Sequence, residues 1–63
     1  MKRVDLLRHL RKMGVIFVRE GARHSVFLNP QIGKTSTVPR HNEIDDFLIR
    51  KICRDLGIQE PKR

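Results

Sequence analysis

The fold is decided by residues 15–39, VIFVREGARHSVFLNPQIGKTSTVP. Runs of β-branched and aromatic residues are interrupted here by glycine, asparagine and proline, which is typical of short strands joined by turns. The predicted strands are residues 15–18, 24–28 and 35–38, with turns near Gly21 and Asn29-Pro30 and an end at Pro39. Because the connections are short, we expect an antiparallel meander of three strands.

A helix is predicted on either side of these strands. Residues 3–13 carry leucines at helical spacing, and Gly14 follows as the expected left-handed cap. The second helix is predicted to begin with Asn42 as its N-cap and to end at Gly57. Its apolar stripe consists of Leu48, Ile49, Ile52, Cys53 and Leu56. We therefore expect one α+β domain over residues 1–58, with the order α-β-β-β-α, a three-stranded antiparallel sheet and both helices on one face, followed by a short basic tail at 59–63.

The chain is strongly basic. Its 14 Lys and Arg residues outnumber its 7 Asp and Glu residues, so the formal net charge is +7 at pH 7. A field of that sign favours polyanionic partners, namely nucleic acid, acidic protein surfaces or anionic membranes. The single cysteine excludes an internal disulfide, and neither a signal peptide nor an apolar run of membrane-spanning length is recognisable. We expect a cytoplasmic protein that does not enter the membrane.

Neither a cofactor nor a metal ion is predicted. The three histidines and the cysteine show no pair at zinc-ligand spacing, and the four glycines are spread out as turns and caps. Glu43, Asp45 and Asp46 are explained by the positive end of the second helix dipole. Cys53 belongs to the apolar stripe, which argues for a place in the core rather than a nucleophilic role.

The αβββα order is that of the double-stranded-RNA-binding fold, and particular residues extend this likeness. They are Leu6-Leu7 with Leu10 and Gly14, the run GARHSVF at 21–27, Asn29-Pro30, the segment Val38-Pro39-Arg40-His41, and Ile52 with Leu56-Gly57-Ile58. In this order they resemble the HicA family of toxin–antitoxin mRNA interferases, from about residue 3 to about residue 58. One departure is that the family's glycine directly before the histidine is displaced to Gly21, which leaves Ala22-Arg23 in between.

RNA cleavage without a metal needs a group that moves the proton of the 2′-hydroxyl, and histidine titrates close enough to neutral pH to do so. The resemblance implies that His24 is this catalytic residue, whereas the pattern alone favours a structural or surface histidine. The residues leave its orientation open. His24 points inward if Val26 and Leu28 face the core, and onto the open sheet face if Phe27 does.

Three cations are candidates for RNA contacts. Arg23, Lys34 and Arg40 lie in or beside turns and strand ends, where they could hold the RNA backbone, although each is equally explained as a solvated surface charge. His41 precedes the second helix and could bind substrate or assist proton transfer.

The resemblance implies a metal-independent endoribonuclease that cleaves mRNA and is neutralised by a HicB-type antitoxin. Two other functions remain open. A non-catalytic RNA-binding module of the same fold would bind RNA without cutting it, with an affinity that falls as salt rises. A protein-interaction subunit would show no RNA affinity at moderate salt.

Overall fold

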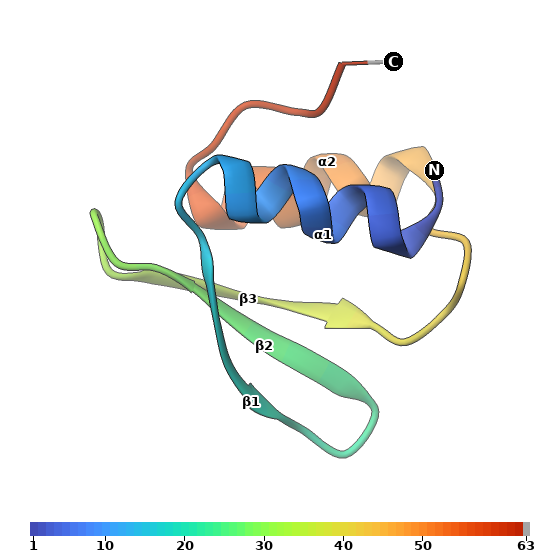
Figure 1. Ribbon diagram of the computed structural model, residues 1–63, viewed down its shortest axis with the longest axis horizontal. Coiled ribbons are helices and arrows are strands. Elements are labelled where there is room, and N and C mark those ends of the chain that lie inside the picture. The colour runs from blue at the N-terminus through green and yellow to red at the C-terminus, as the bar shows by residue number, and fades with distance from the viewer. Residues whose placement is uncertain (63) are drawn as a thin grey trace.

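The computed structural model describes residues 1–62 and contains two helices and three strands (Figure 1). In chain order these are α1 (Arg3–Lys12), β1 (Ile16–Glu20), β2 (His24–Asn29), β3 (Lys34–Pro39) and α2 (Asp46–Leu56). The strands form one antiparallel sheet in the order β1-β2-β3. The predicted α+β class and element order are therefore confirmed. Of the predicted basic tail, Arg63 lies outside the described residues.

The strands are longer than predicted where their ends carry polar residues. β1 extends through Arg19 and Glu20, while the second hairpin includes Asn29 and Lys34, which pair with each other. Ladder hydrogen bonds come from the backbone and do not require apolar side chains. A prediction based on apolar runs therefore ends these strands too early.

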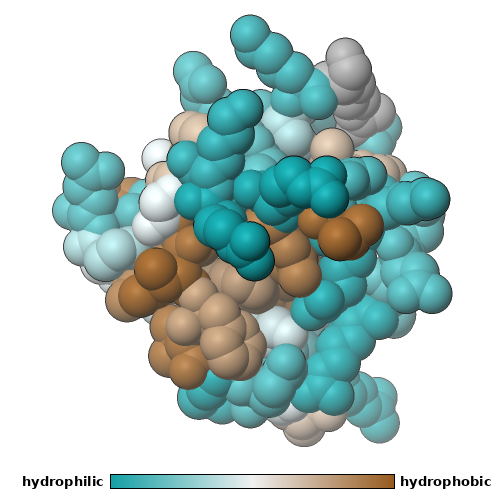
Figure 2. Space-filling model, viewed as in Figure 1, coloured by the Kyte–Doolittle hydropathy of each residue, from teal (hydrophilic) through white to brown (hydrophobic). Residues whose placement is uncertain are grey.

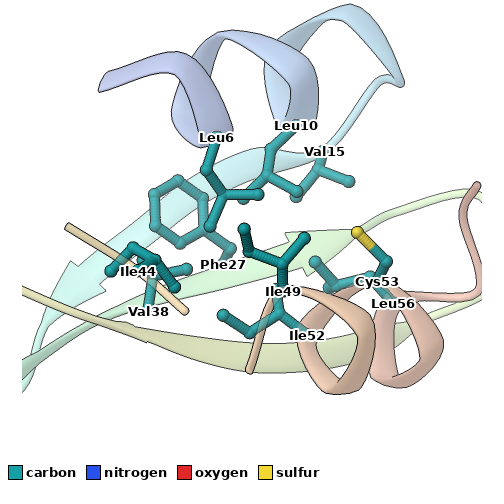
Figure 3. Packing of buried hydrophobic residues seen from close by; sticks show 10 residues of the cluster. All are labelled: Leu6, Leu10, Val15, Phe27, Val38, Ile44, Ile49, Ile52, Cys53 and Leu56. Atoms are coloured by element: carbon teal, nitrogen blue, oxygen red, sulfur yellow. The ribbon is translucent and has the colours of Figure 1, made fainter. Parts of the chain in front are cut away.

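Both helices lie on one side of the sheet, and the core fills the space between the two layers (Figures 1 and 3). The buried apolar residues are Leu6, Leu10, Val15, Phe27, Val38, Ile44, Ile49, Ile52, Cys53 and Leu56. The stripe predicted for the second helix is confirmed, with Leu48 half-buried at its margin. Since the sheet's buried apolar side chains come from β2 and β3, the helices cover these strands and leave β1 outside the core.

Strand β1 is consequently exposed along its whole length. Ile16, Phe17 and Val18 are 49%, 54% and 48% exposed. Apolar side chains gather over this part of the molecule in Figure 2. The Phe17 ring meets Phe27 edge-on at a centroid distance of 5.8 Å, which is its contact with the core.

A β-bulge interrupts β1. Phe17 pairs with Phe27, whereas Arg19 pairs with Val26, so Val18 is the extra residue between them. In a regular strand, residues two apart share a face. Because of the bulge, Phe17 lies on the helix side of the sheet and Arg19 lies on the open side.

Helix α2 begins later than predicted. Its N-cap is Asp45, whose carboxylate accepts a hydrogen bond of 2.8 Å from the backbone N–H of Leu48, so the assignment of Asn42 as the cap is wrong. The carbonyl of Asn42 instead accepts a 2.8 Å hydrogen bond from the backbone of Arg3 at the start of α1. Lys2 and Glu43 also form an antiparallel bridge beside this bond, and the helix begins only after these contacts.

The predicted left-handed glycines after both helices are confirmed. Helix α1 ends at Lys12, one residue earlier than predicted, with Met13 as its C-cap and Gly14 after it at φ of 85°, while Gly57 caps α2 with φ of 65°. Only glycine adopts such values without steric cost. Within the described residues no helix is long and apolar enough to cross a membrane.

Candidate active site

His24 is the first residue of β2 and is exposed. Burial alternates along this strand, because Ser25, Phe27 and Asn29 are buried on the helix side. His24 therefore lies on the open face of the sheet, together with Val26 and Leu28. Of the two orientations that the sequence left open, the structure has the outward one.

A short turn, residues 21–23, leads into His24. The backbone N–H of Gly21 donates a 2.7 Å hydrogen bond to the carbonyl oxygen of His24. A Cβ at position 21 would lie 3.3 Å from that oxygen, which is tighter than nine in ten real Cβ contacts. The displaced glycine therefore closes the turn. Arg23 is exposed at its tip, directly before His24.

Arg40 is bound to this turn. Its Nη2 donates to Glu20 Oε1 at 2.9 Å and to the Gly21 carbonyl at 2.8 Å, and its Nε donates to the same carboxylate oxygen at 3.2 Å. Half-exposed ion pairs add little free energy by themselves. These three bonds nevertheless join the end of β1, the turn and the residue after β3. Arg40 keeps only its Nη1 group without a hydrogen bond to residues 1–62.

Ser25 extends the network to the first helix. Its buried hydroxyl donates to the two carboxylate oxygens of Glu20, at 3.0 and 3.1 Å, and accepts from Nη2 of Arg3 at 2.9 Å. Nε of Arg3 also donates to the Pro39 carbonyl at 2.8 Å. The Ser25 hydrogen bond, and after it the hydrogen bond and charge of Arg40, lower the pKa of Glu20 below its ordinary 4.5, against desolvation that raises it.

Strand pairing sets the position of His41. His24 lies opposite Pro39 in the β2–β3 ladder. Arg40 and His41 follow Pro39 directly, and both are exposed. The segment 40–41 therefore lies at the same end of the sheet as His24 and the turn.

Lys34 lies at the opposite end of the sheet. It pairs with Asn29, five residues further along β2 than His24, which corresponds to about 17 Å at about 3.4 Å per residue. Its partner Asn29 is buried and donates to the Leu56 carbonyl at 2.8 Å, so this pair belongs to the helix side. The structure thus brings Arg23, Arg40 and His41 to the end that carries His24, but not Lys34.

The sequence prediction missed Glu20, Ser25 and Arg3. Ser25 offered a signal, because a polar residue that shares a face with Phe27 is buried in the fold and needs a hydrogen-bond partner. The identity of that partner depends on the bulge in β1, which turns Glu20 towards Ser25. This bulge has no evident mark in the sequence.

A metal ion and the thiol of Cys53 are the other two possible sources of chemistry. No cluster of three or more His, Cys, Asp or Glu side chains within residues 1–62 is arranged to hold a metal ion. Cys53 is buried, which confirms its predicted place in the core. Desolvation, with a smaller contribution from the charge of Glu60, raises the pKa of its thiol to about 11. The thiol therefore stays protonated at neutral pH.

Comparison with known proteins identifies the family. Residues 4–58 match the family described as HicA toxin of bacterial toxin-antitoxin. The matched range includes all three strands, α2, His24 with its turn, and all but the first residue of α1. Searches of curated proteins and of solved structures gave no significant match. Because the family match spans most of the chain, this chain belongs to the HicA toxin family.

Proposed function

We propose that this member of the HicA toxin family is a metal-independent endoribonuclease, which cleaves mRNA in the cytoplasm through His24. The observation that carries the proposal is the exposure of His24 on the uncovered sheet face, at the end where Arg23, Arg40 and His41 also lie. A long RNA can reach a histidine in that place without entering a pocket.

His24 moves a proton in the proposed reaction. It takes the proton of the 2′-hydroxyl, whose oxygen attacks the adjacent phosphorus. The bond from phosphorus to the 5′-oxygen then breaks, and that oxygen takes a proton from water. The products are a 2′,3′-cyclic phosphate and a 5′-hydroxyl, and no oxidant or cofactor is required.

The neighbouring cations serve the developing negative charge. Arg23 is exposed beside His24, and its guanidinium can donate two hydrogen bonds to one phosphate. Arg40 contributes mainly by holding the turn, with Nη1 left for RNA. His41 supports binding or proton transfer from the same end. Lys34 lies at the opposite end of the sheet. We propose that it contacts the RNA backbone away from the reacting phosphate.

The toxin family implies an antitoxin, and we propose one of the HicB type. Two features of the surface favour a protein partner. The net charge of +7 suits an acidic surface. The apolar side chains of Ile16, Phe17 and Val18, half-exposed on β1, suit a covering polypeptide. An antitoxin bound there and on the open face would exclude RNA from His24.

Cleavage and binding together test the proposal. Purified protein without antitoxin is incubated with a long unstructured RNA and excess chelator, and His24→Ala is treated in parallel. We expect the wild type alone to cut, while both bind RNA with similar affinity. Binding without cutting by either protein would indicate an RNA-binding module. No RNA affinity at moderate salt would indicate a protein-interaction subunit.

A further inference from the structure

The bulge at Val18 places Arg19 on the open face of the sheet. Regular alternation would place Arg19 on the same side as Phe17, towards the helices. The pairing of Arg19 with Val26 places it instead on the side of Val26 and His24. This reversal depends on the one extra residue in β1.

Arg19 and His24 are diagonal neighbours on this face. Arg19 lies opposite Val26, and His24 is two residues before Val26 on β2. Diagonal pairs across antiparallel strands are about 7–8 Å apart, a separation that long side chains span. The guanidinium also lies over the turn, since Nη1 of Arg19 is 3.9 Å from the position of a Cβ at Gly21.

The charge of Arg19 is uncompensated within the described chain. Its side chain is exposed and makes no ion pair or hydrogen bond to residues 1–62. The adjacent carboxylate of Glu20 faces the other side of the sheet, where Ser25 and Arg40 bind it. Consecutive strand residues face opposite sides of a sheet, and the bulge places the positive residue of this pair, rather than Glu20, on the side of His24.

We infer that Arg19 forms a phosphate-binding subsite next to His24, which holds one phosphate of the RNA adjacent to the cleaved bond. The planar guanidinium donates two parallel hydrogen bonds to phosphate oxygens, a geometry that fixes the RNA backbone relative to a neighbouring group. The inference rests on the proposed function for its substrate. A carboxylate of a protein partner is the competing occupant, which equal RNA affinities of the two variants compared below would favour.

Binding is measured first, with a single-stranded RNA whose 2′-hydroxyls are methylated and which therefore cannot be cut. Arg19→Gln is compared with Arg54→Gln, which removes the same charge from an exposed position on α2. We expect Arg19→Gln to weaken RNA binding several-fold more than Arg54→Gln at moderate salt, and Arg19→Lys to recover part of the loss. The plot of log affinity against log salt should be less steep for Arg19→Gln than for the wild type, by about 0.7, which is the value for one phosphate of a single strand.

Cleavage then locates the subsite. After the cut position in an RNA has been mapped, the phosphate on either side of it is replaced in turn by a neutral methylphosphonate. One of the two replacements should slow RNA cleavage by the wild type about tenfold. The same replacement should not slow cleavage by Arg19→Gln any further, because this variant is already slowed. Equal RNA affinities and salt slopes for Arg19→Gln and Arg54→Gln would overturn the subsite. If the wild type binds RNA but does not cut, the proposed function fails while the binding comparison still decides the role of Arg19.

Discussion

Glu20 binds three groups around the turn that carries His24. Its carboxylate accepts hydrogen bonds from Ser25 and from two nitrogens of Arg40, while Arg40 also holds the Gly21 carbonyl. The hydrogen bonds to Glu20 favour its ionised form, which accounts for its lowered pKa. A single carboxylate therefore links the position of His24 to the end of β3.

This link predicts a pH-dependent contribution to stability. The pKa of Glu20 is lower in the folded state than the ordinary 4.5, so its contribution is present above pH 4.5 and is lost as the pH falls through the folded-state value. Glu20→Gln should be less stable than the wild type at pH 7, and the difference should shrink at pH 3.5. Urea unfolding followed by circular dichroism at both pH values measures it.

Glu60→Gln is the matched control for this prediction. Glu60 meets Arg50 only at 4.0 Å, on an exposed surface. Its removal should change the free energy of unfolding little at either pH. If Glu20→Gln lowered the free energy of unfolding by the same amount at pH 7 and at pH 3.5, the ionised carboxylate would not stabilise the turn.

At the scale of elements, the start of α2 gives a direct test. Asp45→Ala should destabilise the protein by about 0.5–2 kcal/mol, because the N–H of Leu48 loses its capping partner. Asn42→Ala should change stability by less than about 0.5 kcal/mol, since the bond from this residue to Arg3 uses its backbone carbonyl. Urea midpoints of the two variants provide the comparison. A larger loss for Asn42→Ala would return the cap to the position predicted from sequence.

Local signals in the sequence were sufficient for the order of the elements. Gly14, Gly21, Asn29-Pro30 and Gly57 mark the turns and helix ends correctly, and the apolar spacing of the second helix identifies its buried face. The placement of His24 at the start of β2 also follows from this pattern. These features depend on residues close together in the chain.

The features that could not be predicted from the sequence depend on pairing between distant segments of the chain. Asn42 and Asp45 are both suitable caps, and the contact of residue 42 with Arg3 decides between them. The bulge at Val18 depends on how β1 aligns with β2, and it determines the faces of Arg19 and Glu20. The β2–β3 register likewise carries Lys34 away from His24.

At the scale of the whole molecule, one small core supports the fold. For 63 residues the net stability is about 3–9 kcal/mol at typical values per residue. Ile52 is 1% exposed at the centre of the core, and Ile52→Ala should cost about 2–5 kcal/mol, a large share of that total. The conservative Ile52→Val should cost about 0.5–1.5 kcal/mol. Thermal or urea unfolding ranks these variants.

Phe47 provides the comparison on the same helix. Its side chain is 73% exposed, so Phe47→Ala should leave stability within about 0.5 kcal/mol of the wild type. Similar losses for Phe47→Ala and Ile52→Ala would mean that α2 does not pack through the stripe described above.

The central claim is that His24, exposed on the open sheet face, cuts RNA by using the RNA's own 2′-hydroxyl. The most direct test is the chemistry of the new ends, determined after incubation of RNA with wild type or His24→Ala in excess chelator. We expect 2′,3′-cyclic phosphate and 5′-hydroxyl ends with the wild type, and uncut RNA with His24→Ala. Cleavage that persists in His24→Ala, or that leaves 5′-phosphate ends, would contradict it.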